Sequence, residues 1–205
     1  MTAQKNPASP RAYRMSRRLE SVEETRSRIA AATFELHATI GPARTTISAV
    51  AERAGVQRHT VYHHFPDLTS LFEACVDHGI RVTRMPEAEP WLAIPDPTAR
   101  LRTGLGELYG YYRVNARLIG NIYRDMPMFA DVGGTAQFDD RMAGMFNALA
   151  GDWAVTDSLR PSVTAAVGHA MSYETWRSLT QGGIADDQAR DMMVGFVTGI
   201  AGPVS

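Results

Sequence analysis

The chain has 205 residues, of which 44% are hydrophobic and 21% charged, and its formal net charge is -1. This length and balance fit a folded protein with a sizeable core and exclude a disordered chain. A single cysteine, Cys75, excludes an internal disulfide, and no window approaches the roughly 20 apolar residues of a membrane span. Because no secretory signal begins the chain, we expect a cytoplasmic protein without a membrane partner.

The charge is divided unevenly along the chain. Residues 1–85 carry 12 Lys and Arg against 8 Asp and Glu, whereas residues 86–205 carry 9 against 14. The balance is therefore +4 in the first part and -5 in the second. Such a division indicates that the N-terminal part contacts a polyanion and the remainder does not.

Residues 1–20 are expected to form a flexible basic arm, because prolines and serines surround several arginines. These are Arg11, Arg14, Arg17 and Arg18. The arm either follows DNA phosphates or the minor groove, or is a solvated tail. Ser21 and Glu24 then have the spacing of a capping box, which predicts that a first helix starts there and ends at Gly41.

Residues 21–85 are predicted to contain four helices, since apolar residues recur at helical spacing and no alternating β-branched run is present. Gly55, between the second and third helices, suits a sharp turn. The second to fourth helices are expected at Ile47–Ala54 after the N-cap Thr46, at Arg58–His64, and from Asp67 to about Arg84.

Two short helices joined by a turn describe a helix-turn-helix, whose second helix enters the DNA major groove. Val61 and Phe65 lie one turn apart and are expected to face the core. The opposite face then presents groups that hydrogen-bond to base edges and phosphates. This face contains Arg58, His59, Thr60, Tyr62 and His63.

A metal site is an alternative use of the three histidines in this segment, because His59 and His63 are one helical turn apart. No Asp, Glu or Cys within the helix completes a ligand set, and Asp67 is expected to cap the next helix. We therefore predict no metal and no cofactor.

Four prolines between Pro86 and Pro97 mark a domain boundary, so residues 86–205 are expected to form a second helical domain. Asp96 and Pro97 fit the start of its first helix. Further helices are predicted at about 117–125, 135–153, 161–181 and 186–200. The fold class is therefore all-α, with about nine helices.

The segment TTISAVAERAGVQRHTVYHHF resembles the signature of the tetracycline-repressor (TetR) family of bacterial transcriptional regulators. The shared elements are Thr45-Thr46, Val50-Ala51, Ala54-Gly55-Val56 and Thr60 to Phe65. The likeness covers about residues 21–84. It implies a repressor that binds a palindromic DNA operator as a homodimer and is released by a small-molecule effector, which shifts the fourth helix.

The same resemblance implies which residues contact DNA. These are Thr45, Thr46, Ser48, Gln57, Arg58, His59, Thr60, Tyr62, His63 and His64. Two positions depart from the family pattern. Gln57 replaces a small hydroxyl residue that caps the recognition helix, and Leu68 replaces a lysine that binds phosphate.

The resemblance also assigns roles to the second domain. The last two long helices, 161–181 and 186–200, would form the homodimer, using apolar stripes that alternatively complete a monomeric core. The stripes contain Ala165, Ala166, Val167, Ala170, Met193, Val194, Val197 and Ile200. The central helices would enclose the effector, although each of their aromatic and methionine residues also suits an ordinary core. The candidate effector contacts are Tyr109, Tyr112, Arg113, Asn121, Arg124, Met142, Met145, Phe146, His169, Tyr173 and Trp176.

Two other classes of protein compete with this interpretation. An enzyme is disfavoured, because the sequence has no Gly-rich phosphate loop, nucleophile elbow or cluster of metal ligands. The alternative is a helical ligand-binding or interaction protein without working DNA recognition. Gln57 and Leu68 favour this alternative, because they depart from the DNA-binding pattern of the family.

Overall fold

The computed structural model describes residues 10–128 and 136–202, and every regular element within them is helical. This confirms the all-α class. The helices are α1 (Pro10–Thr39), η1 (Pro42–Arg44), α2 (Ile47–Ala54), α3 (Arg58–His64), α4 (Leu68–Val82), α5 (Glu89–Leu92), α6 (Pro97–Val114), α7 (Ala116–Asp125), η2 (Met126–Met128), α8 (Ala136–Ala150), α9 (Arg160–Met171), α10 (Tyr173–Gln181) and α11 (Asp186–Ala201).

The first helix begins earlier than predicted, so residues 10–20 are helical and do not form a flexible arm. Pro10 suits a helix start, and no helix-breaking residue follows it in this stretch. Ser16 donates its hydroxyl to Glu20 Oε1 across 2.9 Å along the helix. Ser21 lies inside the helix, where its carbonyl oxygen accepts the Thr25 hydroxyl, so the capping-box interpretation was wrong. Residues 1–9 lie outside the described residues.

The described chain contains eleven α-helices and two 3₁₀ helices, more than the nine or so expected. One addition is α5, a single turn within the proline-rich segment, which forms because Trp91 is fully buried and donates Nε1–H to Glu107. The other arises because the predicted helix 161–181 is divided at Ser172, whose backbone is extended. The prediction of one helix there was wrong.

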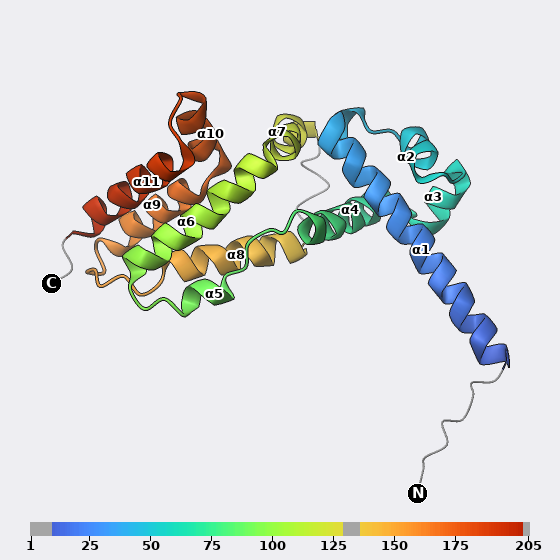
Figure 1. Ribbon diagram of the computed structural model, residues 1–205, viewed down its shortest axis with the longest axis horizontal. Coiled ribbons are helices and arrows are strands. Elements are labelled where there is room, and N and C mark those ends of the chain that lie inside the picture. The colour runs from blue at the N-terminus through green and yellow to red at the C-terminus, as the bar shows by residue number, and fades with distance from the viewer. Residues whose placement is uncertain (1–9, 129–135, 203–205) are drawn as a thin grey trace, which may run out of the picture.

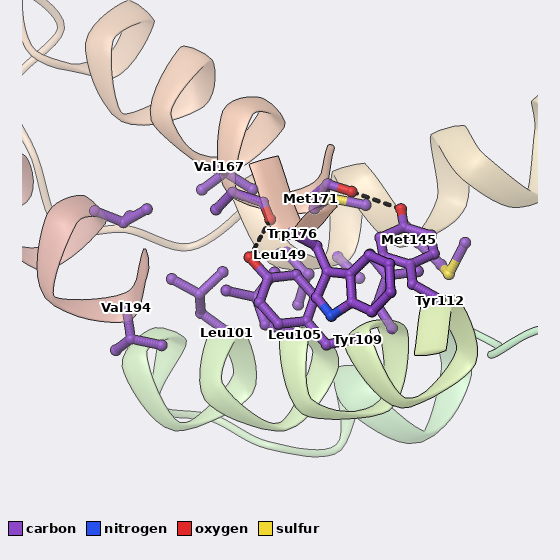
Figure 2. Close-up of a cluster of buried hydrophobic side chains, with 14 of the residues drawn as sticks. Leu101, Leu105, Tyr109, Tyr112, Met145, Leu149, Val167, Met171, Trp176 and Val194 are labelled. Atoms are coloured by element: carbon purple, nitrogen blue, oxygen red, sulfur yellow. Dashed lines mark hydrogen bonds between the residues drawn. The ribbon is translucent and has the colours of Figure 1, made fainter. Parts of the chain in front are cut away.

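The break at Ser172 follows from packing against α6. A continuous helix would use the carbonyl oxygens of Ala170 and Met171 internally. Here they accept the hydroxyls of Tyr109 and Tyr112, at 2.7 and 2.6 Å (Figure 2). The two tyrosines thus satisfy the carbonyl groups that the break leaves free.

Two hydrophobic cores meet within α4. The smaller core joins α1 to α4 and includes Ile29, Val50 and Leu71. The larger core joins α4, α5 and the helices from α6 to α11, and Ile80 of α4 contributes to it together with Met85. Figure 1 shows α2 and α3 beside α1 at one end of the molecule, and α9 and α11 at the other. Helix α4 therefore belongs both to the predicted DNA-binding part and to the larger body.

Candidate nucleic-acid interface

The turn between α2 and α3 is built as the sequence suggests. The Thr46 hydroxyl oxygen accepts the Ala49 amide at the start of α2, across 3.2 Å. Gly55 ends that helix in the left-handed region, with φ 66° and ψ 38°. A side chain there would be strained, so glycine suits the sharp turn that sets the angle between the two helices.

Helix α3 is anchored by one apolar face. Val61 is completely buried and Phe65, just after the helix, is 2% exposed. Both pack with Ile29 and Val50 of α1 and α2. Because these contacts fix the orientation of α3, its opposite face has a defined direction.

That opposite face is polar and open to solvent. Arg58, His59 and His63 are exposed, Tyr62 is 50% exposed, and Thr60 is half-buried. Of the other predicted DNA contacts, Thr46, Ser48 and Gln57 are exposed, and Thr45 and His64 are half-buried. The arrangement places imidazole, phenol and guanidinium donors on one short helix at the outer end of the molecule (Figure 1). It can hydrogen-bond to base edges and phosphates.

Arg26 of α1 supports this helix, and the sequence reasoning missed it. Its Nη1 donates to the carbonyl oxygen of His64 across 2.8 Å, and its guanidinium lies 4.3 Å from the centre of the Phe65 ring. Burial, the neighbouring His63 and Arg26 together lower the pKa of His64. The signal available in the sequence was a cation one helical turn before Ile29, on the face of α1 that turns toward the core.

The two departures from the family pattern have visible consequences. Gln57 occupies the N-cap position of α3 without a side-chain hydrogen bond to the helix. Leu68 is 60% exposed at the first turn of α4, where it supplies no charge. Asp67 caps that helix by accepting the Ser70 amide at 2.7 Å, and this hydrogen bond lowers the pKa of Asp67.

The residues predicted to enclose an effector occupy several different environments. Tyr109 and Met145 are completely buried in the larger core, and Tyr112 is 5% exposed; burial raises the pKa of both tyrosines (Figure 2). Met142 and Phe146 pack partly buried against that core. Arg113 forms an ion pair with Asp186 at 3.1 Å.

The remaining candidates differ in burial, and four of them share one groove. His169 is exposed and packs its ring edge against Phe196. Asn121, Arg124, Tyr173 and Trp176 line one groove between α7 and α10. The structure thus brings these four together. Tyr173 and Trp176 are 4% and 6% exposed and belong to the larger core, as do Tyr109, Tyr112 and Met145.

The described residues offer little to other kinds of site. Among them, no three His, Cys, Asp or Glu side chains gather in a way that would hold a metal ion. None of the described helices combines the length and apolar character needed to cross a bilayer. Cys75 is buried beside His37, 3.5 Å from its Nδ1, and burial raises the thiol pKa to about 12. Such a thiol is a poor nucleophile.

Comparison with known proteins agrees with this geometry. Residues 29–75 match the family model described as "Bacterial regulatory proteins, tetR family". The match begins within α1 and continues through α2 and α3 into α4. These residues therefore form the DNA-binding region that the tetR family model describes. The family resemblance seen in the sequence is thereby confirmed.

Two transcriptional regulators are similar to this chain, one of them over only part of its length. It is 33% identical over 102 residues to the probable HTH-type transcriptional regulator ArpR of Pseudomonas putida, which covers 48% of this chain. The match spans about half of that relative, 47% of its length. A TetR-like transcriptional regulator from Rhodococcus sp. RHA1 shares the fold, with a TM-score of 0.56 and 21% identity over 87% of this chain and 97% of that one.

Proposed function

We propose that this tetR-family regulator is a cytoplasmic repressor that binds a palindromic DNA operator as a homodimer and is released by a small-molecule effector. The observation that carries the proposal is the exposed polar face of α3, held outward by buried Val61 and Phe65. This helix would lie in the major groove, with Arg58, Tyr62 and His63 against bases and phosphates.

The N-terminal turns of α1 would bind further phosphates. They project beyond α3 in Figure 1, and the residues from Met15 to Glu24 are exposed. Arg17 and Arg18 lie on this projection, while Leu68 supplies no cation at α4. A deletion of residues 1–18 should therefore reduce the salt dependence of DNA binding, with a change in slope of about 1 for each phosphate that these turns neutralise.

A second copy of the chain would bind at the exposed face of α9 and α11. Met192 is 49% and Phe196 is 46% exposed, which leaves apolar surface on α11, next to exposed Ala165 and His169 of α9. Glycines at 195 and 199 lie on the same side, with open space around them, and permit close approach. Two-fold pairing would place two α3 helices on successive major grooves, about 34–36 Å apart.

Some of the apolar residues predicted to form the subunit contact are instead buried in the larger core of the same chain. Buried members are Ala166, Val167, Ala170, Val194 and Val197. These residues complete the larger core of the monomer, as the alternative interpretation had it. Only the outward residues of α9 and α11 remain to form a subunit contact.

Effector release would act on the separation of the two α3 helices. Helix α4 contributes residues to both cores. A displacement of α4 within the larger core would therefore also move the smaller core, which holds α3. An effector that binds the displaced arrangement some hundred-fold better supplies about 2.7 kcal/mol of coupling. A misfit of a few ångströms between half-sites then prevents simultaneous docking.

The test is a protection assay on the DNA that flanks the chain's own gene. A palindromic protected region, absent in the double variant R58A/H63A, supports the proposal. No protection at any flanking site at low salt, with the protein folded, would favour the other function considered, a helical ligand-binding protein without DNA recognition.

A further inference from the structure

A groove of about 740 Å³ lies between α7 and α10, in the size range of small-molecule sites. Its lining combines aromatic rings with guanidinium groups and contains a single carboxylate, that of Glu174. The aromatic residues are Tyr123, Tyr173 and Trp176, and the cations are Arg117, Arg124 and Arg177. The lining therefore has a net positive charge.

The aromatic wall of the groove is ordered. The rings of Tyr123 and Tyr173 have centroids 5.0 Å apart, and those of Tyr173 and Trp176 are 5.5 Å apart. The Tyr173 hydroxyl donates to the carbonyl oxygen of Ala116 across 3.1 Å, which ties α10 to α7. Tyr173 and Trp176 are 4% and 6% exposed and support Tyr123 from within the core. Tyr123 is 40% exposed, so a flat ring can stack on it.

Two cations of the groove also hold the end of α1. Arg117 Nη2 donates to the carbonyl oxygen of Thr39 at 2.7 Å, and Arg124 Nη2 donates to that of Ile40 at 3.4 Å. Between them, Asn121 Nδ2 donates to the carbonyl oxygens of His37 and Ala38, both at 3.1 Å. We call these three α7 side chains, together with Asp125, which accepts the Ala43 amide at 3.1 Å, the clasp.

The clasp satisfies the carbonyl groups that every helix leaves free at its C-terminus. Since α1 also packs against α2 and α4, the clasp, together with α4, sets where the helices of the smaller core lie on the larger body (Figure 1). The groove and the clasp share Arg117, Asn121 and Arg124. A molecule in the groove therefore reaches side chains that position the DNA-binding part.

We propose that this groove binds a planar aromatic anion, such as an aryl carboxylate, and that binding loosens the clasp. The inference rests on the proposed function, since it names the effector class and the route by which the effector acts. The ring stacks against the exposed Tyr123, and the carboxylate is held by Arg117 and Arg177.

The chemistry favours this exchange of partners. Arg117 donates to a neutral carbonyl oxygen, whereas a carboxylate carries a full opposite charge and can accept two parallel hydrogen bonds from one guanidinium. Arg177 is 3.4 Å from Glu174 on a half-exposed surface, where ion pairs contribute little. An incoming carboxylate competes for both guanidinium groups, and the last carbonyl groups of α1 then lack a donor.

The first experiment measures binding without DNA. Naphthoate and its neutral amide, naphthamide, are titrated into the full chain by calorimetry. We expect naphthoate to bind and naphthamide to bind at least about ten-fold more weakly, because only the first carries a charge. R177Q, which leaves the clasp intact, should weaken naphthoate binding about ten-fold, whereas E174Q should strengthen it.

R81Q on α4 is the matched control, because it removes one exposed arginine outside the groove and should leave the affinity unchanged. Absence of naphthoate binding, equal affinity for naphthamide, or unchanged affinity in R177Q each overturns the site.

Hydrogen exchange at the end of α1 tests the coupling. Naphthoate should speed exchange of the Ala43 amide, which donates to the clasp, in the wild-type chain and not in R177Q. Binding without this change overturns the route through the clasp. Both measurements are independent of DNA, so they can fail while the protection assay succeeds, and the reverse also holds.

Discussion

Arg26 of α1 donates from Nη1 to the backbone carbonyl oxygen of His64, the last residue of α3, across 2.8 Å. The same guanidinium lies 4.3 Å from the centre of the Phe65 ring. The first helix thus holds the end of the recognition helix by a charge-assisted hydrogen bond and a cation–π contact. The position of α3 on its scaffold depends on this side chain.

The substitution R26M should therefore weaken both stability and DNA binding. A partly buried carbonyl oxygen is left without its donor, which costs about 1–3 kcal/mol of unfolding free energy. DNA affinity should fall further than for R28M, a control that removes an exposed cation two residues along α1. Urea unfolding and an anisotropy titration on DNA measure the two effects. Equal losses in both variants would mean that Arg26 acts by its charge alone.

The exposed donors of α3 should contribute to DNA affinity without contributing to folding. Y62F removes one hydroxyl and H63A one imidazole from a solvent-exposed face, so each should cost about 1–3 kcal/mol of binding free energy. The melting temperature should stay within about 2 °C of the wild type, because surface substitutions change stability little. Intact affinity in both variants would show that this face does not contact DNA.

The sequence predicted the bounds of α2, α3 and α4 well because the signals that start and end these helices are local. Thr46, Gly55 and Asp67 act on their own turns, so a cap or a left-handed turn can be recognised from neighbouring residues. The start of α1 at Pro10 was missed because the Ser21 and Glu24 spacing also occurs inside a helix. The local pattern did not distinguish the two.

The larger domain was less predictable because its features depend on distant contacts. The break at Ser172 is stabilised by two tyrosine hydroxyls that come from about 60 residues earlier in the chain. The aromatic spacing that suggested an effector pocket instead describes packed core at Tyr109 and Tyr112. No motif or spacing in the sequence distinguishes Arg117 and Arg177 from other arginines. They come together in one groove only when the chain is folded.

Buried His37 should make the stability of the chain depend on pH. Burial lowers its pKa to about 4, against an ordinary value of 6.5, despite the nearby Asp125 carboxylate. The unfolded chain therefore takes up this proton before the folded chain does. The resulting stabilisation is present above pH 6.5 and is lost as the pH falls toward 4.

Lowering the pH from 7.5 to 4.5 should reduce the unfolding free energy by about 2–3 kcal/mol through this group. Urea unfolding at the two pH values measures the loss, and the loss should be smaller by that amount in H37N. The substitution H59N at the exposed face of α3 is the control and should lose as much as the wild type. An unchanged pH dependence in H37N would show that other groups dominate acid unfolding.

The exposed face of α11 should determine the oligomeric state. F196E places a charge at the centre of the proposed subunit contact, where an unpaired buried charge is costly. Sedimentation analysis should show a dimer for the wild type and a monomer for the variant at micromolar concentration. L92E adds the same charge at a residue of α5 that is 58% exposed, and it should remain dimeric. A dimeric F196E would place the contact elsewhere.

The position of Gly41 should make the attachment of α1 sensitive to a single methyl group. Its φ is 93°, which side chains adopt only with strain, and a Cβ would overlap the guanidinium of Arg124. G41A should therefore lower the unfolding free energy by about 1–3 kcal/mol and speed hydrogen exchange at Ala43.

The matched substitution G110A lies within α6, where a Cβ meets no neighbouring atom. It should raise the unfolding free energy by about 0.5–1 kcal/mol, because alanine is the better helix former. If urea unfolding shows a lower unfolding free energy for G41A and a higher one for G110A, the loss in G41A comes from strain at the clasp and not from the added methyl group as such. A neutral G41A with unchanged exchange at Ala43 would show that the clasp tolerates displacement of Arg124, and that it does not fix the smaller domain on the larger body.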